Sequence, residues 1–285
     1  MGAPMRRSAT VGGHHLSYLE AGPAHGQPVL LIHGLASDSQ TWDKAIGPLA
    51  GRGLRVIAVD LLGHGESDKP AGGYLLDDFA RQLHGLLTGI GLGAATLCGH
   101  SLGGAIAVHF GYHYPQHVSR LVLVSAGGLG REVHLALRAG ALPIAPRVVG
   151  WAMRSPMRAL YADPRLHRLL RLTPDNVANL RRAGRALSDE EGRAAFFAAL
   201  RGVIEPSGQK GSFLEMRYLA DQVPTLLVWS EKDGVIPVAH AHATQQHLPG
   251  SKLVVFPGGG HEPHRRHAAR FADAVASFVE ATPIG

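Results

Sequence analysis

The feature that most constrains the fold is a serine flanked by glycines and placed between two regular elements. Residues 94–98 form a short apolar run, which is typical of a buried strand, and residues 105–112 have the pattern of a helix. Between them, Gly99, Ser101 and Gly103 form a Gly-x-Ser-x-Gly pattern. A strand that turns at once into a helix strains its corner residue, and a Cβ at either flanking position would clash with the crossing elements. The pattern therefore predicts that Ser101 projects from the sheet, above the positive end of the new helix, as a nucleophilic hydroxyl.

The composition is that of an ordinary globular chain. Of its 285 residues, 45% are hydrophobic and 18% are charged, which is enough to form one large α/β domain or a core with an inserted subdomain. The formal net charge is +6, but the lysines and arginines are scattered and form no basic stripe interleaved with aromatic residues. We therefore expect no nucleic-acid partner. The single cysteine, Cys98, excludes an intrachain disulfide.

The sequence carries no membrane signal. Residues 1–13 include Arg6 and Arg7 but no apolar segment behind them, so we expect no secretory signal. No apolar run approaches the roughly 20 residues that a transmembrane helix needs. We expect a cytoplasmic protein without membrane attachment, and the sequence leaves open whether it is a monomer or a homodimer.

Strand and helix patterns alternate along most of the chain, which predicts right-handed βαβ units and a mostly parallel sheet. A hairpin of two short strands around Gly12 and Gly13 precedes them. The predicted strands cover residues 8–11, 14–20, 28–32, 55–60, 94–98, 118–124, 224–229 and 252–256. The predicted helices cover residues 39–49, 75–90, 105–112, 238–247 and 264–280.

The alternation stops between about residues 131 and 212. We find no clear strand there, and prolines break the segment into helical fragments. Apolar side chains nevertheless recur at helical spacing, as in Phe196, Phe197 and Leu200. The segment is therefore predicted to be a helical insertion rather than a linker.

A serine hydroxyl needs a base within hydrogen-bond reach, so we searched for acidic and basic partners. In an open parallel sheet, reactive groups gather at the carboxyl ends of the strands. Asp233 lies just past the end of one predicted strand, and His261 lies in a glycine-rich loop after the last one. Glu231 is a rival acid at the same strand end, ranked below Asp233. The chain order Ser101, Asp233, His261 is the nucleophile–acid–base order of a known fold.

These residues lie in five segments that resemble the α/β-hydrolase superfamily, in its cap-bearing branch of serine esterases and C–C hydrolases. The segments are Leu-Ile-His-Gly-Leu at 31–35, Asp-Leu-Leu-Gly-His-Gly-Glu-Ser at 60–67, Gly-His-Ser-Leu-Gly-Gly at 99–104, Trp-Ser-Glu-Lys-Asp-Gly-Val-Ile-Pro at 229–237 and Gly-His at 260–261. The resemblance implies a mostly parallel eight-stranded sheet with helices on both faces. It also implies a core formed by residues 1–130 and 212–285 and a helical cap, or lid, at residues 131–211.

The same resemblance assigns roles to the candidate catalytic residues. Ser101 would be the nucleophile, and His261 the general base that later protonates the leaving group. Asp233 would orient His261 and stabilise its imidazolium form. The oxyanion hole would consist of the backbone N–H groups of Leu35 and Leu102, which is why those side chains need not be polar.

Other parts of the matching segments have supporting roles. Some superfamily members carry the acid after the strand that follows the elbow helix, and residues 125–127 hold no carboxylate, which favours Asp233. His33 is expected to brace its loop, and the loop at residues 63–67 is expected to be structural. We assign no role to His100.

We expect no cofactor and no metal. No Gly-x-Gly-x-x-Gly follows a strand and opens a helix. His261, Glu262, His264 and His267 lack the His-Glu-x-x-His spacing of a zinc site, so we expect an exposed helix start there.

The leading functional hypothesis is hydrolysis of a carboxylic ester, lactone or thioester of a small, largely apolar molecule through an acyl-enzyme. The serine at the elbow argues against the haloalkane dehalogenase and epoxide hydrolase relatives, which carry Asp there. C–C bond hydrolysis of a diketone-type substrate is the first alternative, although Glu262 stands where an aromatic residue often follows the catalytic histidine. A cyclase or lyase, or a small-molecule-binding signalling protein, is the alternative from another class. The candidate cap contacts are Leu135, Leu137, Leu142, Trp151, Met153, Met157, Leu160 and Tyr161. We expect most apolar residues of the cap to form its own core, so none of them is named as a site residue.

Overall fold

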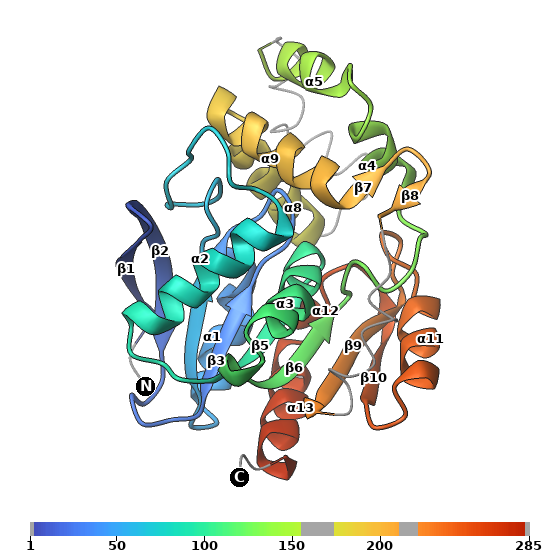
Figure 1. Cartoon of the computed structure of the whole chain (residues 1–285). Coiled ribbons are helices and arrows are strands. Elements are labelled where there is room, and N and C mark those ends of the chain that lie inside the picture. Colours follow the sequence, from blue (N-terminus) through green and yellow to red (C-terminus); the bar gives the residue numbers. More distant parts are fainter. Residues whose placement is uncertain (1–2, 155–173, 211–221, 283–285) are drawn as a thin grey trace.

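A mixed β-sheet forms the centre of the molecule. The structure, a computed structural model, describes residues 3–154, 174–210 and 222–282. Within these ranges eight strands pair in the order β1-β2-β4-β3-β5-β6-β9-β10 (Figure 1). The strands are β1 (Met5–Val11), β2 (His14–Ala21), β3 (Pro28–Ile32), β4 (Arg55–Val59), β5 (Ala95–His100), β6 (Val118–Val124), β9 (Thr225–Lys232) and β10 (Lys252–Gly259).

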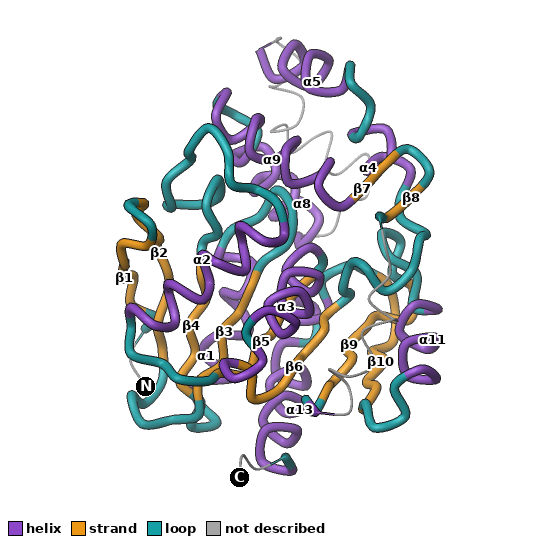
Figure 2. The backbone as a smooth tube through the Cα atoms, in the orientation of Figure 1, coloured by secondary structure: helices purple, strands orange, loops and turns teal. Residues whose placement is uncertain are grey.

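The sheet is mostly parallel, as the sequence predicts. β1 pairs antiparallel with β2, and β2 pairs antiparallel with β4, whereas every pairing from β4 to β10 is parallel. The predicted hairpin around Gly12 and Gly13 is therefore the antiparallel edge of the sheet (Figure 2). Parallel strands place all their carboxyl ends at one edge, which is the edge at which a reactive site is expected.

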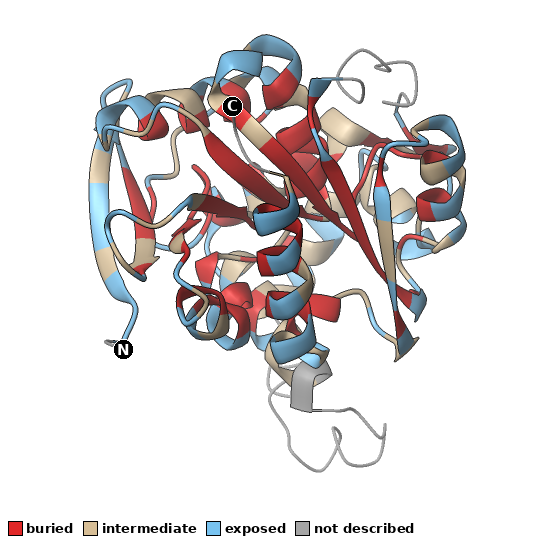
Figure 3. Cartoon of the chain, turned by 90° about the horizontal axis from the view of Figure 1, so that it is seen from below, coloured by how far each residue is buried: buried red, intermediate tan, exposed pale blue. Residues whose placement is uncertain are grey.

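The central strands are buried on both faces, which explains their unbroken apolar sequences. In β3, Leu30 and Ile32 belong to one hydrophobic cluster, and Val29 and Leu31 belong to a second cluster on the opposite face. All four side chains are fully buried. Figure 3 shows this burial along the middle of the sheet and the exposed residues of the outer strand β1.

Helices cover both faces of the sheet. The first cluster includes α2 (Leu76–Gly89) and α3 (Leu102–His113), and the second includes α1 (Asp43–Ala50) and α13 (Ala268–Ala281). Shorter elements connect them, namely η1 (Ser39–Trp42), η2 (Pro115–His117), α11 (Ala239–His247) and α12 (Pro263–Arg266). In the described part of the chain, none of the helices combines the length and the apolar character needed to cross a membrane.

The segment between β6 and β9 lies beyond the edge of the sheet at which β5 and β6 end (Figure 1). It contains α4 (Leu135–Gly140), α5 (Ala145–Arg154), α8 (Pro174–Ala186), α9 (Glu190–Val203), β7 (Ile204–Glu205) and β8 (Gly208–Gln209). The expectation that this segment has no strand is wrong, because β7 and β8 pair antiparallel across a tight turn. Strands of two residues are too short to produce a sequence periodicity.

The start of the last helical region also corrects an expectation. The predicted single helix is two helices, α12 and α13, separated at His267. Its start is not exposed, because His264 is fully buried and Arg265 is 5% exposed. The His264 ring packs against Trp42 with 4.2 Å between ring centroids, and its Nε2 donates to the Thr41 hydroxyl at 3.2 Å. These contacts come from residues more than 200 positions away, which local sequence patterns do not report.

Candidate active site

Ser101 lies at the corner between β5 and α3 in the strained conformation that the pattern predicts. Its φ of 54° and ψ of −118° lie in a region that L-residues with a side chain rarely adopt. The surrounding backbone holds it there, because its N–H donates to the Val124 carbonyl at 3.0 Å and its carbonyl accepts the Gly127 N–H at 2.9 Å. The corner is therefore fixed by the neighbouring strand β6 and the loop that follows it.

The two flanking glycines are required by close approach of the backbone. A Cβ on Gly99 would lie 2.1 Å from the Gly103 carbonyl oxygen, and a Cβ on Gly103 would lie 2.2 Å from that of Ile32. Both distances are far below any real carbon–oxygen contact. The elbow can therefore form only when both positions lack a side chain.

Backbone strain gathers at the carboxyl edge of the sheet. Among the described residues, the three non-glycine residues with positive φ are Ala36, Ser101 and Ser125, with φ values of 50°, 54° and 45°. They follow β3, β5 and β6, which are neighbours in the sheet. Strained residues cluster where a structure positions reactive groups, so this edge is the candidate site.

His261 and Asp233 meet at this edge, as their strand-end positions predict. His261 Nδ1 lies 2.9 Å from Asp233 Oδ2 and 3.1 Å from Oδ1, and the Asp233 side chain is fully buried. A carboxylate only accepts hydrogen bonds, so Nδ1 carries the proton in this contact. The lone pair of the neutral imidazole is then on Nε2, the atom that a general base uses.

Asp233 is held as a carboxylate. Burial raises its pKa, but the hydrogen bond and charge of His261 and two backbone N–H donors lower it, and the net pKa is below its usual value. The donors are Val235 N at 2.8 Å and Ile236 N at 3.1 Å. Glu231, the rival acid, is exposed and accepts from Gly258 N at 3.4 Å instead.

The second ring nitrogen of His261, Nε2, is buried. In the described structure, Nε2 has no hydrogen-bond partner, so it is not bonded to the Ser101 hydroxyl. Catalytic hydrogen bonds are often long in ligand-free enzymes and tighten when substrate binds. Among the described residues, the ring thus has an acceptor nitrogen that no protein group occupies.

His100 contributes to the site in a way that sequence reasoning missed. Its Nε2–H donates to the backbone carbonyl of His261 at 2.7 Å, and the two ring centroids lie 4.8 Å apart. Burial, together with repulsion from His261, lowers the pKa of His100 to about 3, so the ring is neutral at pH 7. His100 therefore ties the His261 loop to the end of β5, next to Ser101. Its position beside the serine is the one signal in the sequence that could have indicated this.

The loop after β3 passes directly beside the serine. A Cβ on Gly34 would lie 3.0 Å from the Ser101 Cβ, which brings the next residue, Leu35, into the site. His33 braces this loop, because its Nε2 accepts from Leu61 N at 3.1 Å and its Nδ1 donates to the Gly34 carbonyl at 2.8 Å.

Leu102 is the first residue of α3, where backbone N–H groups have no partner inside the helix. Both Leu35 and Leu102 line the same pocket as Ser101.

The loop at residues 63–67 packs around a buried carboxylate rather than lining the serine pocket. Asp60 accepts from Ser39 N at 2.6 Å and from Glu66 N at 3.1 Å, and it forms an ion pair with Arg6 at 2.8 Å. A Cβ on Gly65 would lie 2.4 Å from the Asp60 carboxyl carbon, so this glycine is required by close packing. The loop is therefore structural and does not line the serine pocket.

The pocket that contains Ser101 is mostly apolar. Its cavity volume is about 50 Å³. Its apolar wall includes Leu35, Leu76, Ala105, Val133, Leu137 and Ile204, and its polar groups include Gln209 and Lys210. Gln209 comes from β8 and accepts from Gly128 N at 2.8 Å, so the inserted segment is anchored to the loop after β6.

The candidate contact residues of the insertion have different positions. Leu137 lines the pocket, whereas Leu135 and Trp151 are 70% and 63% exposed. Leu142 is also exposed. Met157, Leu160 and Tyr161 lie outside the described residues.

A buried ion-pair network joins the insertion to the residue after His261. Arg182 of α8 donates to both Glu262 carboxylate oxygens, at 2.7 and 3.0 Å. Arg265 lies 3.5 Å from the same carboxylate and 2.6 Å from Asp43 of α1. The Arg182 and Glu262 side chains are 6% and 12% exposed. In the sequence, Glu262 is notable only because an aromatic residue often occupies this position, and nothing there indicates that Arg182 is its partner.

The histidines and the glutamate around residue 261 are engaged by protein groups rather than arranged around a common centre. His261 pairs with Asp233, and Glu262 pairs with Arg182. His264 binds Thr41, and His267 Nε2 donates to the Pro257 carbonyl at 3.1 Å. Apart from Thr41, which also donates to Glu262, these side chains have different partners.

Comparison with known proteins agrees with this architecture. The family model of the alpha/beta hydrolase fold matches residues 27–268. An uncharacterised protein of Mycobacterium tuberculosis (strain ATCC 25618 / H37Rv) is 37% identical over 299 residues, covering 98% of this chain and 82% of the relative. The 2-hydroxy-6-oxo-6-(2'-aminophenyl)hexa-2,4-dienoic acid hydrolase of Metapseudomonas resinovorans is 31% identical over 286 residues, covering 97% of this chain and 91% of the relative.

A solved structure also has the same fold. The crystal structure of a serine hydrolase involved in carbazole degradation superposes with a TM-score of 0.75 and 30% identity, covering 98% of this chain and all of the other. Homologues of the chain include esterases and C–C hydrolases. Together with the strained serine, the His261–Asp233 pair and the sheet order, these matches show that the chain belongs to the alpha/beta hydrolase fold family.

Proposed function

We propose that this protein is a serine hydrolase that cleaves a carboxylic ester, or a related lactone or thioester, of a small and largely apolar molecule. The observation that carries the proposal is the contact of 2.9 Å between His261 and the buried Asp233 at the edge where Ser101 is exposed to an apolar pocket. Acyl transfer needs a histidine oriented by a carboxylate and a serine hydroxyl that faces the substrate, and both are present beside this mostly apolar pocket.

Acylation begins when the Ser101 hydroxyl attacks the substrate carbonyl carbon. His261 Nε2 takes the hydroxyl proton, and Asp233 stabilises the resulting imidazolium. The negative charge that develops on the carbonyl oxygen is stabilised by the backbone N–H groups of Leu35 and Leu102. Collapse of the tetrahedral intermediate breaks the bond to the leaving alcohol, which receives the proton from His261 and departs, leaving an acyl group on Ser101.

Deacylation repeats these steps with water as the nucleophile. His261 removes a proton from the water molecule while its oxygen attacks the acyl carbon. The second tetrahedral intermediate collapses to release the carboxylic acid, and Ser101 recovers its proton from His261. His261 therefore ends each cycle neutral, with Nδ1–H still bound to Asp233.

The inserted segment, residues 131–211, would act as the cap over this site. Leu137, Val203 and Ile204 of this segment line the Ser101 pocket, and Gln209 joins it to the core. An apolar cap excludes water and selects substrates by shape, which suits a small apolar acyl or alcohol group.

C–C bond hydrolysis is the second candidate function. The observation that favours it is the 31% identity over 97% of the chain to a hydrolase of a 2-hydroxy-6-oxo-dienoic acid. Ser101 would attack the ketone carbonyl as His261 takes its proton, and the adjacent C–C bond would then break. The carbon fragment would leave as an enolate and receive the proton from His261, with the acyl group left on Ser101. Glu262 counts against this second candidate, because it stands where an aromatic residue often follows the catalytic histidine, and its carboxylate is instead paired with Arg182.

The test combines covalent labelling with two substrate classes. The wild-type protein and a Ser101→Ala variant are exposed to a fluorophosphonate, and intact mass reports the adduct. Turnover is then measured with p-nitrophenyl esters from acetate to decanoate and with 2-hydroxy-6-oxo-6-phenylhexa-2,4-dienoate. We expect one adduct on the wild type, none on the variant, and ester turnover that falls in Ser101→Ala by a factor on the order of 10³–10⁶.

The outcomes separate the hypotheses. Faster turnover of the dienoate than of every ester would replace ester hydrolysis by C–C hydrolysis. An adduct without turnover of either class would mean that the activated serine serves a different reaction. If the wild type forms no adduct, Ser101 is not an activated nucleophile and the proposal fails.

A further inference from the structure

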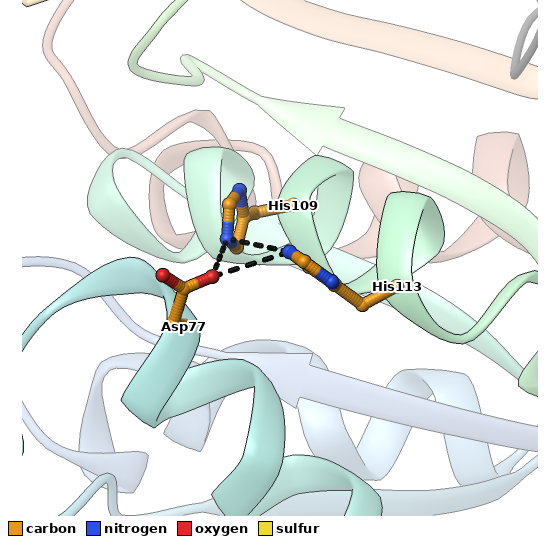
Figure 4. A group of neighbouring side chains, drawn as sticks. All are labelled: Asp77, His109 and His113. Atoms are coloured by element: carbon orange, nitrogen blue, oxygen red, sulfur yellow. Dashed lines mark hydrogen bonds and ion pairs between the residues drawn. The ribbon is translucent and has the colours of Figure 1, made fainter.

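Two helices on one face of the sheet bring together a group of potential metal ligands far from the catalytic histidine in sequence. Asp77 lies in the first turn of α2, and His109 and His113 lie on α3. Figure 4 shows the carboxylate of Asp77 facing both imidazole rings. The two histidines are four residues apart, so they lie on the same face of their helix.

The three donor atoms are spaced as the ligands of a small tetrahedral cation would be. Asp77 Oδ1 lies 2.6 Å from His109 Nε2 and 3.2 Å from His113 Nε2, and the two nitrogens are 3.2 Å apart. Zinc bound at 2.0–2.1 Å in tetrahedral geometry separates its ligands by about 3.3 Å. Two of the three separations already match that value, and the third requires a movement of well under 1 Å.

The local charges also suit a cation. His113 is the last residue of α3, where the helix dipole is negative. The Asp77 carboxylate already accepts a hydrogen bond from His109 Nε2 at 2.6 Å, so it supplies an anionic oxygen at the point where the two imidazoles meet. Arg81, on the next turn of α2, forms its ion pair with Asp78, although its charge also acts on Asp77.

We propose that Asp77, His109 and His113 form a surface site for a divalent cation of the zinc class, with water in the fourth position. The set of two imidazoles and one carboxylate is typical of zinc sites, and an i, i+4 histidine pair on a helix is a known way to present two ligands to zinc. The expectation that the chain holds no metal rests on the residues around His261. Asp77 is 32 residues away from His109 in the sequence, so no short motif marks this group.

The site would act as a clamp rather than as part of the reaction. His109 lies eight residues after Ser101 on α3, about 12 Å along the helix axis. A bound ion would tie α2 to α3, whose N-terminus carries the elbow serine. A cation that binds only the folded chain stabilises that chain. When the free cation concentration is a hundred times its Kd, Tm should rise by an amount on the order of 5 °C.

The test is a zinc titration of chelator-treated protein from which any polyhistidine tag has been removed. Isothermal calorimetry and Tm are measured for the wild type, His113→Ala and Asp77→Asn. His242→Ala, an exposed histidine on α11, is the matched control because the chain contains 18 histidines. The visible spectrum with Co²⁺ in place of zinc reports whether the coordination is tetrahedral.

We expect one zinc ion per chain in the wild type and in His242→Ala, with the increase in Tm in both. His113→Ala and Asp77→Asn should each weaken zinc binding at least about tenfold. Replacing a residue that only supports a metal ligand already lowers metal affinity by about tenfold, so replacing a ligand should lower it by no less. Equal zinc affinity in all four proteins would place the ion elsewhere and overturn the proposal. The absence of zinc binding by the wild type would overturn it as well.

Discussion

At the scale of single residues, the proposed chemistry depends on how Asp233 is surrounded. Its carboxylate is fully buried and accepts hydrogen bonds from His261 and from two backbone N–H groups. Replacing it with asparagine keeps the shape but removes the charge. An amide can also donate to Nδ1, which would place the imidazole proton on the wrong nitrogen for a general base.

We therefore predict that Asp233→Asn lowers kcat for the best ester by a factor on the order of 10³–10⁴ while the protein remains folded. Glu231→Gln, at the exposed end of the same strand, should retain kcat close to the wild-type value. Steady-state kinetics at pH 8, with far-UV circular dichroism as a check on folding, measure both variants. A larger loss in Glu231→Gln would show that the acid has been assigned to the wrong residue.

The residues of the site differ in how far the sequence could predict them. Gly99 and Gly103 were predictable because the elbow has one steric solution, and Asp233 and His261 because parallel strands place their ends at one edge. His100 and Arg182 were not predictable. Each acts through a partner more than 75 residues away in sequence, and neither belongs to a pattern that specifies its partner.

At the scale of elements, the contact between α8 and the His261 loop connects the insertion to the site. Arg182 and Glu262 are almost fully desolvated, and two more groups, Arg265 and Thr41, bind the same carboxylate. Removing one member of such a pair leaves the other buried without its partner, which costs more than removing both. The pair therefore has two measurable effects, one on stability and one on the position of His261.

We predict that Arg182→Met and Glu262→Gln are each destabilising, and that the double variant is less destabilised than the sum of the two, with a coupling energy of about 1–3 kcal/mol. Because Glu262 follows His261 directly, kcat should also fall in both single variants. Urea unfolding and ester kinetics on the four proteins of this cycle provide the two measurements. Strictly additive free energies would show that the observed contact does not stabilise the fold.

Elements were predictable where a pattern repeats and unpredictable where it is short. The apolar runs of β3 and β4 identify strands covered on both faces, and both strands are found at their predicted places to within one residue. The paired segments β7 and β8 contain two residues each, so no alternation can be detected. The break between α12 and α13 lies at His267, where φ is −123° and ψ is 42°, and no glycine or proline in residues 264–280 marks it in the sequence.

At the scale of the whole molecule, buried histidines link stability to pH. Burial, with repulsion from nearby histidines, lowers the pKa of both His64 and His100 to about 3, and burial lowers those of His33 and His264 as well. In the unfolded chain a histidine takes up its proton near pH 6.5. The unfolded state therefore binds more protons than the native state at every pH between about 6.5 and 3, and acid favours unfolding across that interval.

We predict that lowering the pH from 7 to 5 reduces the free energy of unfolding by about 2 kcal/mol for each of His64 and His100. Asp233 adds nothing in this interval, because its lowered pKa makes its contribution to stability disappear only below pH 4.

Urea unfolding at the two pH values measures how much the free energy of unfolding changes with pH. His64→Asn, which keeps a donor for the Leu62 carbonyl but cannot titrate, should reduce the loss by about 2 kcal/mol, whereas exposed His25→Asn should leave it unchanged. An unchanged pH dependence in His64→Asn would mean that this histidine is already protonated in the folded protein at pH 5.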